Sequence, residues 1–400
     1  MVRALEGDAE VDAFFGLAAA TFPGYHRVHC TPAPDGSVAA GWRRFVEGMP
    51  SFRAGHLRGA FEGDGLIGGY LHEERWLHAG VARLRTGYVG AVVTDPSHRG
   101  RGVGSALMRD ALAHGRERRQ ALLFLRGVAD YYGRFGYADV MDTAEHGVEP
   151  ARVLALEAPD CQVRAATAED APALLDLHVR HYLPYTGSYA RTLAQQEHFL
   201  HHRAEPPLLA VDGEGVPRGY LMLPAGAERA NAVEAAADTW PAALALLRRH
   251  AACAAGAAEL RWPLPPDSPT YFHLADHLPL RSETRSRPDA AFMARPADVV
   301  ALFDGLVPLW RERWRRARAV RYGALVLEVD GERCCLELAD DLRRLERAPS
   351  GAAVVALTPQ ALTQLVFGYR PARWLAPAAA GTLDVLFPAG AAWYPASNRC

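Results

Sequence analysis

The chain has 400 residues, of which 50% are hydrophobic, and this predicts two or three globular domains. Its 44 basic residues nearly balance 46 acidic ones, so net charge gives no reason to expect nucleic acid or an anionic membrane as a partner. Every basic residue is an arginine, which excludes a Schiff-base lysine, a pyridoxal phosphate anchor and a lysine general base. We therefore expect a small polar molecule as the partner.

The cysteines and the apolar runs indicate the cellular compartment in which the protein is expected. Six cysteines, two of them adjacent at Cys334 and Cys335, form no disulfide framework. The first residues lack the apolar core of a signal peptide, and the apolar runs are too short to span a bilayer. These features predict a cytoplasmic protein.

The first informative segment joins an apolar strand to a helix. The strand runs from Tyr88 to Thr94, and helical periodicity begins at Val103. Between them lie Gly100 and Gly102, and Gly104 follows in the first helical turn. Small residues at a helix N-terminus leave backbone N–H groups uncovered, and the helix dipole favours an anion there. The segment predicts a pyrophosphate-binding loop.

The spacing decides between the known kinds of phosphate loop. In the dinucleotide pattern Gly-x-Gly-x-x-Gly, read from Gly100, the third glycine is replaced by Ser105, and Arg116 to Arg119 downstream is basic except for Glu117. That reading fits poorly. A Walker loop needs a lysine and is excluded. The remaining fit is Arg-x-x-Gly-x-Gly, from Arg99 to Gly104.

A second apolar strand, Ala121 to Leu125, is followed by Tyr132-Gly133-Arg134-Phe135-Gly136-Tyr137. Together with the Arg-x-x-Gly-x-Gly loop, this string resembles the GNAT acetyltransferases, particularly the enhanced intracellular survival (Eis) family. The resemblance implies acetyl-CoA as cosubstrate, without a metal. The cofactor-binding residues that it implies are Val92, Val93, Thr94, Gly100, Arg101, Gly102, Val103, Gly104, Ser105, Gly127 and Val128.

The loop departs from a common family pattern in having glycine at Gly100 and Gly104, where bulkier or basic residues can occur. The backbone donors survive this change, whereas a side-chain contact to phosphate can be lost.

Two catalytic roles also come from the resemblance. Tyr132 would protonate the departing thiolate, and a phenol of pKa about 10 can do so with a thiol of pKa about 8.5 only modestly uphill. Tyr131 and Tyr137 compete for the same description. In the Eis family the terminal carboxylate serves as base, which here would be that of Cys400, although the family usually ends in an aromatic residue. A disordered tail is the alternative.

An internal repeat divides the first 290 residues. Val2-Arg3-Ala4 is echoed by Val163-Arg164-Ala165, and Asp64 to Leu71 is echoed by Gly213 to Leu221. Two copies of one fold would explain this, and chance similarity of hairpins is the alternative. Between Leu221 and Trp262 the second copy has no Arg-x-x-Gly-x-Gly, so we expect that it binds no cofactor.

The pattern changes from about Ala291. An amphipathic segment, Pro296 to Leu309, precedes alternating strands at Ala324 to Val329 and Cys334 to Leu338, then Ala352 to Leu357 and a helix from Pro359 to Phe367. This resembles the sterol-carrier-protein-like domain that closes Eis-family chains, where a scaffold role is the simplest expectation.

Other clusters give weaker signals. His178 with His181, and His198 with His201 and His202, have helical spacing but no further ligand set nearby, so we expect no metal. No Gly-x-Ser-x-Gly elbow supports serine hydrolysis. The arginines from Arg311 to Arg318 indicate a solvated or subunit-contacting helix face.

The expected fold class is α/β (α+β): tandem GNAT folds over 1–150 and 151–290, the second degenerate, and a sterol-carrier-protein-like α+β domain over 291–400. The expected function is acetyl-CoA-dependent N-acetyl transfer to primary amines of a small polyamine such as an aminoglycoside, or to lysine amines. The family's hexamer is implied by resemblance. The alternative is a non-enzymatic ligand or lipid carrier with a relic GNAT domain.

Overall fold

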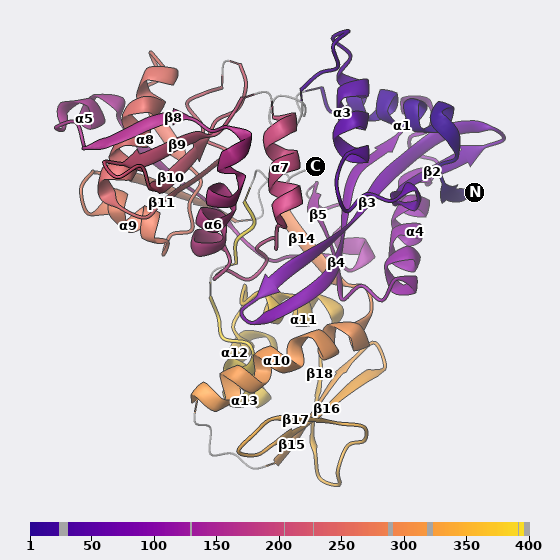
Figure 1. Cartoon of the computed structure of the whole chain (residues 1–400). Helices are drawn as coiled ribbons and strands as arrows, with labels where there is room; N and C mark the ends of the chain where they lie inside the picture. Colours follow the sequence, from indigo (N-terminus) through magenta and orange to yellow (C-terminus); the bar gives the residue numbers. More distant parts are fainter. Residues whose placement is uncertain are drawn as a thin grey trace.

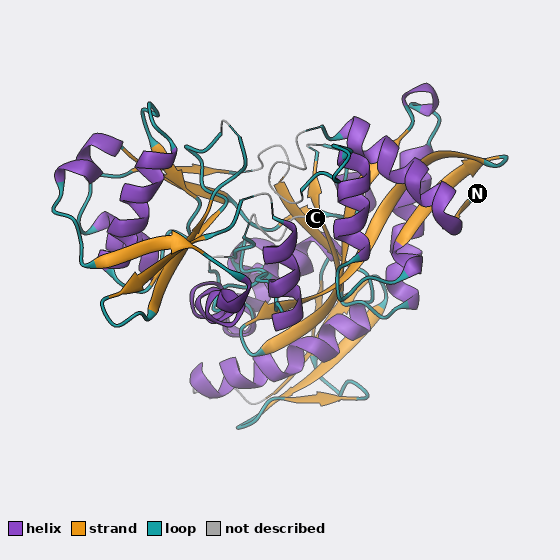
Figure 2. Ribbon diagram, turned by 45° about the horizontal axis from the view of Figure 1, so that its top comes forward, coloured by secondary structure: helices purple, strands orange, loops and turns teal. Residues whose placement is uncertain are grey.

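The computed structural model describes residues 1–23, 31–128, 130–203, 205–226, 228–286, 291–317, 323–390 and 392–395. Figure 1 shows an N-terminal part at the right, a middle part at the left and a C-terminal part at the bottom. Figure 2 shows helices and strands in each of them. Within the described ranges, no helix is long and apolar enough to cross a membrane.

The N-terminal part is built on one seven-stranded sheet. In spatial order its strands are β1 (Val2–Ala4), β2 (Leu57–Glu62), β3 (Gly65–Ala79), β4 (Ala82–Thr94), β5 (Leu122–Gly127), β14 (Ala291–Pro296) and β6 (Ala138–Asp139). Neighbouring strands pair antiparallel, except β4 and β5, which are parallel. A parallel pair needs a crossover, and the helix α4 (Val103–Glu117) provides it.

Alternating side chains of this sheet pack on its two faces. Tyr88 on β4 belongs to the core formed with α1 (Gly7–Thr21) and α3 (Val38–Glu47), whereas the next residue, Val89, packs with α4. On α4, apolar residues four apart bury one helix face against the sheet, and they are Val103, Leu107 and Ala111. The sheet therefore carries α1 and α3 on one face and α4 on the other.

The middle part repeats this plan in a smaller form. Its sheet has the order β8 (Cys161–Ala165), β9 (Leu208–Asp212), β10 (Pro217–Met222) and β11 (Glu234–Ala237), all antiparallel, as in β1 to β4. Arg3 on β1 pairs with Glu10 at 2.6 Å, and Arg164 on β8 pairs in the same way with Asp170 at 2.6 Å. The fold is therefore a tandem of two related units.

The remaining elements of the middle part surround this sheet. A three-stranded sheet has the order β12 (Leu260–Trp262), β7 (Thr143–Val148) and β13 (Arg281–Arg285). The helices are α5 (Pro150–Ala155), α6 (Ala171–Tyr182), α7 (Leu193–His202), α8 (Trp240–Cys253) and α9 (Pro269–Ala275).

The C-terminal part contains a four-stranded sheet, in the order β17 (Arg343–Leu345), β16 (Glu332–Leu338), β15 (Gly323–Val329) and β18 (Ala353–Ala356). Its helices are α10 (Val299–Ala317), α11 (Pro359–Val366), α12 (Ala372–Leu375) and α13 (Ala380–Leu386). Leu309 on α10 lies against Gly80, in the turn between β3 and β4, so this part packs on the first sheet.

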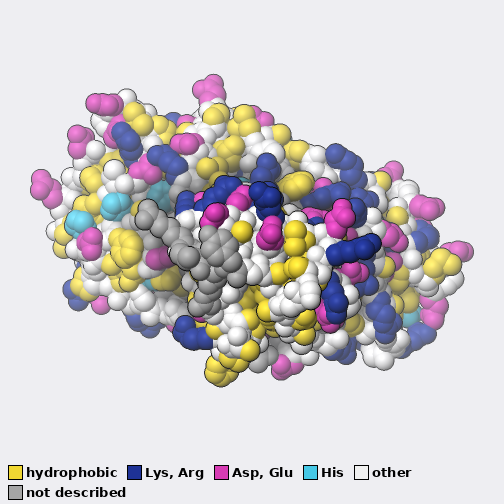
Figure 3. Space-filling view, turned by 90° about the horizontal axis from the view of Figure 1, so that it is seen from below, with side chains coloured by type: hydrophobic (Ala, Val, Ile, Leu, Met, Phe, Trp, Pro, Cys, Tyr) yellow, Lys and Arg dark blue, Asp and Glu magenta, His cyan; other side chains and the backbone are white. Residues whose placement is uncertain are grey.

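Two strands cross the domain limits expected from the sequence. β7 lies before residue 150 and pairs with β12 and β13, while β14 lies after residue 290 and pairs with β5 and β6. The first sheet is thus completed by a strand that follows the whole middle part. On the face in Figure 3, arginine and acidic side chains are interspersed, as the nearly balanced charge leads one to expect.

Candidate functional site

The loop between β4 and α4 is ordered by its own polar groups. The Asp95 carboxylate accepts a hydrogen bond of 2.8 Å from the Ser97 backbone N–H. Gly100 and Gly102 have φ of +76° and +84°, left-handed values that glycine adopts without strain. Gly102 is the N-cap residue of α4, and no side chain caps the helix there. The first-turn N–H groups of α4 are therefore left for a ligand.

A cavity of about 430 Å³ opens over this loop. Six of the predicted cofactor-binding residues line it: Thr94, Gly100, Gly102, Val103, Gly104 and Ser105. Two arginines outside the predicted cofactor-binding set also line it, Arg99 and Arg134. The Arg134 guanidinium lies 4.2 Å over the Tyr131 ring and 3.4 Å from Ser105 Oγ. The arginine in the Tyr-Gly-Arg-Phe string was therefore the sequence feature from which this cationic contact to the cavity could have been predicted.

Bare helix amides together with two guanidinium groups match a diphosphate in charge and geometry. The residues present therefore fit the pyrophosphate of a coenzyme A thioester. Arg101 is directed elsewhere, since its guanidinium pairs with Glu62 at 2.6 Å and lowers the pKa of that carboxyl.

Along the half of β4 that leads into the loop, β4 and β5 separate. They pair only from Thr86 with Leu122 to Tyr88 with Phe124. Further along, β4 has a positive φ of 47° at Ala91 and a register shift against β3. The end of β4, which includes Val92 and Val93, has no strand partner on the β5 side within the described residues. An extended ligand arm can add there by backbone hydrogen bonds.

Gly127 and Val128, at the end of β5, lie outside the loop cavity. Gly127 is buried and pairs with Ala291 on β14, and a side chain at Gly127 would meet the Met293 sulfur. Val128 is 63% exposed. The structure thus gives Gly127 a packing reason to be glycine.

The three candidate tyrosines face different surroundings. Tyr131 places its hydroxyl against Gly104 at the phosphate loop. Tyr137 is fully buried, and its hydroxyl has no hydrogen-bond partner among the described residues. Tyr132 is 7% exposed; burial, with Tyr131 and Tyr88 nearby, raises its pKa to about 12. The Tyr132 ring lies 4.9 Å from the Tyr131 ring and also contacts Gly127 at the end of β5.

The described end of the chain packs beside this opening. The Tyr394 ring lies 5.5 Å from the Phe124 ring, which in turn lies 5.2 Å from the Tyr88 ring. The hydroxyl of Tyr394 accepts a hydrogen bond from the buried Arg75 guanidinium. Cys400 lies outside the described residues.

The histidines take structural partners. His198 Nε2 lies 2.8 Å from the Phe45 carbonyl oxygen, and His181 pairs with Asp238 at 2.9 Å. His178 is buried beside Glu234. Across the part of the chain that the structure describes, no three His, Cys, Asp or Glu side chains gather to hold a metal ion.

The arginines of α10 contact the same C-terminal part. Arg311 donates to the Leu342 carbonyl at 2.9 Å, Arg313 donates to the Leu386 carbonyl at 2.6 Å, and Arg315 pairs with Asp341. Arg318 lies outside the described residues.

Comparison with known proteins agrees with this geometry. Residues 2–140 match the model of an acetyltransferase (GNAT) domain. No curated protein matches the sequence significantly. Several solved structures share the fold over nearly the whole chain.

A probable N-acyltransferase from Enterococcus faecalis superposes with a TM-score of 0.72 at 16% identity, over 99% of this chain and 97% of its own. A GCN5-related N-acetyltransferase from Kribbella flavida superposes with a TM-score of 0.70 at 19% identity, over 100% of this chain and 98% of its own. Eis1 from Mycobacterium abscessus superposes with a TM-score of 0.63 at 20% identity, over 100% of both chains. At such identities the likeness shows a common fold.

The domain match and the loop geometry define the class. Residues 2–140 form a GNAT acetyltransferase domain, and the chain is an N-acetyltransferase enzyme of the GNAT type. GNAT domains use an acyl-CoA, and the loop that leads into α4 fits the pyrophosphate of one.

Proposed function

We propose that the enzyme is Eis-like and transfers the acetyl group of acetyl-CoA to a primary amine. The observation that carries this proposal is the uncapped N-terminus of α4 facing a cavity lined by Arg99, Arg134 and Tyr131. The Tyr132 ring packs 4.9 Å from the Tyr131 ring. The full-length likeness to Eis1 supports the Eis-like assignment, together with the Tyr-Gly-Arg-Phe-Gly-Tyr string.

The predicted contacts divide into two sets along acetyl-CoA. The glycine loop with Val103, Gly104 and Ser105 would hold the pyrophosphate. Val92, Val93 and Thr94 would hydrogen-bond the pantetheine arm along the free side of β4. Arg101, Gly127 and Val128 do not line the loop cavity, and any contact that they make would involve another part of the cosubstrate.

Acetyl-CoA supplies an activated thioester. The reaction joins the amine nitrogen to the acetyl carbon and breaks the carbon–sulfur bond; the amine loses a proton and the thiolate gains one. Tyr132 is the proposed donor to the sulfur. With a pKa of about 12, full proton transfer to a thiolate whose thiol has a pKa of about 8.5 is uphill by roughly 5 kcal/mol. We therefore propose that Tyr132 acts first as a hydrogen-bond donor to the developing thiolate.

The α-carboxylate of Cys400 is the proposed base or ammonium-holding group. Tyr394 packs one ring away from Tyr88, and Cys400 is the sixth residue after Tyr394. Six extended residues reach at most about 20 Å, which suffices to bring the carboxylate to the opening between β4 and β5.

We also propose three units: an active GNAT unit, a degenerate GNAT unit and a sterol-carrier-protein-like scaffold. The sheets support limits near residue 140 for the first two, with β14 returning to the first sheet. Because the chain is an enzyme with an intact loop, we set aside the carrier with a relic domain. A hexamer and a cytoplasmic location remain proposals that rest on resemblance and composition.

The acceptor is tested by thiol release from acetyl-CoA with a panel of amines. The panel contains an aminoglycoside, a linear polyamine, a lysine peptide and small amines with and without a carboxylate. We expect turnover with at least one of them, lost in a variant whose loop cannot bind the cosubstrate. Absence of turnover with every amine would count against the proposed reaction.

A further inference from the structure

A second cavity of about 430 Å³ lies at the edge of β3, away from the loop. β2 pairs with β3 only as far as Leu57 with Leu71, so the later part of β3 is left without β2. The segment from Pro50 to His56 walls the cavity, as do residues between Tyr189 and Gln195 of the middle part. The two cavities share no lining residue.

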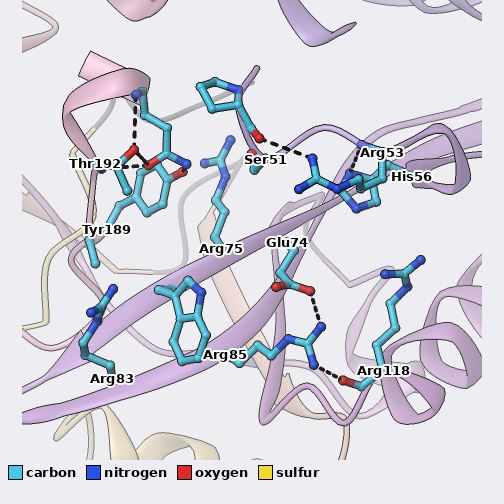
Figure 4. A pocket seen from close by; sticks show the side chains of 14 residues that line it. Ser51, Arg53, His56, Glu74, Arg75, Arg83, Arg85, Arg118, Tyr189 and Thr192 are labelled. Atoms are coloured by element: carbon cyan, nitrogen blue, oxygen red, sulfur yellow. Dashed lines mark hydrogen bonds and ion pairs between the residues drawn. The ribbon is translucent and has the colours of Figure 1, made fainter. Parts of the chain in front are cut away.

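The lining of this cavity is strongly cationic. Figure 4 shows its arginine side chains arranged around one carboxylate, Glu74. Glu74 pairs with one of them, Arg85, at 2.6 Å. The five arginines are Arg53, Arg75, Arg83, Arg85 and Arg118.

Three of these guanidinium groups are not neutralised by an acid. Among the described residues, no carboxylate lies within ion-pair distance of Arg53, Arg83 or Arg118. Arg83 stacks over Trp76 at 5.5 Å, and Arg118 contacts His114 at 2.9 Å. Several uncompensated cations around one cavity repel each other and favour an anionic ligand.

His56 adds a neutral polar group to this wall. Burial, with the nearby Arg118 charge, lowers the pKa of His56 to about 4. The ring is therefore uncharged at pH 7, and its Nδ1 accepts the Arg53 backbone N–H at 3.3 Å. The positive charge of the cavity thus comes from arginines, which stay charged at any pH at which the protein is folded.

We infer that this arginine pocket binds a small molecule that carries at least two oxyanion groups, carboxylate or phosphate. Planar guanidinium groups match both kinds of oxyanion in bidentate geometry. The volume suits a small metabolite rather than a macromolecule.

The pocket reaches the reaction site through Arg75. Arg75 is among the residues that line the pocket, and its buried guanidinium pairs with Glu73 at 2.5 Å. The same guanidinium lies 4.5 Å over the Tyr88 ring and donates to the Tyr394 hydroxyl. Tyr88 is one of the groups that raise the pKa of Tyr132. Arg75 therefore connects the pocket to Tyr88 on β4 and to Tyr394 near the described end of the chain.

This position allows two sources of the anion. It is either an anionic group of the acceptor itself, which rests on the proposed function, or a separate molecule that binds beside the reaction site. Both sources share the same recognition chemistry.

Binding is tested directly by calorimetry with citrate and with inorganic pyrophosphate. The protein is saturated with coenzyme A, so that pyrophosphate cannot enter the loop at α4. We expect binding by the native chain and at least about tenfold weaker binding by the double variant Arg53→Gln/Arg83→Gln, because each lost pair is a charge-assisted hydrogen bond. Both arginines are exposed, so their replacement leaves the fold intact.

The matched control is Arg119→Gln. Arg119 follows Arg118 and is 69% exposed in its side chain, but it does not line the pocket. It removes one positive charge from the same region, against two in the double variant, and breaks only an exposed ion pair with Asp298. We expect the anion affinity of this variant to stay within about twofold of the native value, as for an exposed charge outside the pocket. Two results would overturn the proposal that this pocket binds an anion: no heat of binding with either anion, or an equal loss of anion affinity in the control and in the double variant.

Kinetics then distinguish the two sources. Competition of citrate with the amine, together with a preference for carboxylate-bearing amines over their amides, would identify the anion as part of the acceptor. A change in kcat without competition would identify a separate anion. If no amine is acetylated, the proposed function fails while the calorimetric result stands, so the two failures remain distinct.

Discussion

The two related units begin their corresponding helices in different ways. In the first, β4 and α4 are joined by Asp95 to Gly102, and the helix starts at a left-handed glycine without a side-chain cap. In the second, only Asp238 and Thr239 join β11 and α8, and the Thr239 side chain accepts the Ala242 N–H. One helix end is left open for a ligand, and the other is closed by its own residue.

The difference continues after the helix. In the first unit β5 leads to the Tyr131-Tyr132-Gly133 turn, whereas β12 of the second unit is followed by Pro263, Pro265 and Pro266. The same strand order therefore supports two outcomes. Local loop chemistry, rather than the fold, decides which unit is expected to bind acetyl-CoA.

The largest expected effect concerns the tyrosine that only the first unit has in this place. For Tyr132→Phe we expect kcat to fall by about 10²–10⁴, the span for losing a proton donor, while acetyl-CoA affinity hardly changes. Steady-state kinetics and calorimetry measure the two quantities. Tyr131→Phe and Tyr137→Phe are the controls; a large loss of kcat in either of them would move the role away from Tyr132.

The next effect tests the open helix end. In Gly102→Glu a carboxylate faces the pyrophosphate site, and we expect acetyl-CoA affinity to fall at least about 100-fold, from like-charge repulsion and lost contacts. Gly256→Glu is a close control, because both glycines are exposed with φ of +84° and have open space around an added Cβ. If the two variants bind acetyl-CoA with equal affinity, the loop does not take part in cofactor binding.

The sequence predicts local elements of this site well. Tyr88 to Thr94 lies within β4, and Ala121 to Leu125 overlaps β5, because apolar strands and glycine turns are short-range signals. The amphipathic segment expected from Pro296 to Leu309 begins at the last residue of β14 and belongs mostly to α10, which runs from Val299 to Ala317, past Pro308. A proline signals a stop locally, but here the buried Trp310 and Trp314 beyond it hold the helix against the core.

Contacts between residues far apart in the chain could not be predicted from the sequence. Nothing local to Ala291–Pro296 tells that this strand returns between β5 and β6, and nothing near Arg75 or Arg83 tells that they meet Arg118 around a cavity. The pKa of Tyr132 depends on burial among residues from several elements, and this is why a value near 10 was the natural expectation. Such features follow from topology, which a single sequence specifies only indirectly.

A smaller effect is expected from changing the end of the chain, whose carboxylate is proposed to act at the acceptor site of the first unit. Adding a few residues after Cys400 moves the α-carboxylate away from the acceptor site, and we expect kcat/KM to fall by at least about tenfold, as for a lost general base or ion pair. Cys400→Phe keeps the carboxylate and should be tolerated. Full activity in the extended protein would show that another group takes the proton.

The pH profile should reflect the burial of Tyr132. Since its pKa is raised to about 12, the phenol stays protonated below that pH, and its donor function is lost only as pH rises through about 12. An ordinary tyrosine would be half ionised near pH 10. We expect kcat with saturating amine to change by no more than about twofold between pH 8 and 10 from this group. A falling limb near pH 10 that disappears in Tyr132→Phe would contradict the buried environment.

The smallest effect separates the two helix ends most directly. Thr239→Ala removes the cap of α8 and should lower the free energy of unfolding by about 1 kcal/mol. Thr358→Ala is its match, because Thr358 caps α11 in the same way, accepting from Ala361, and has proline in the first turn. Denaturant unfolding compares the two variants.

Neither variant should alter acetyl-CoA affinity or its stoichiometry of one per chain, because the closed end of α8 offers no free amides to a pyrophosphate. A native stoichiometry near two, or a second site gained in Thr239→Ala, would mean that the second unit has kept a cofactor site despite its short connection.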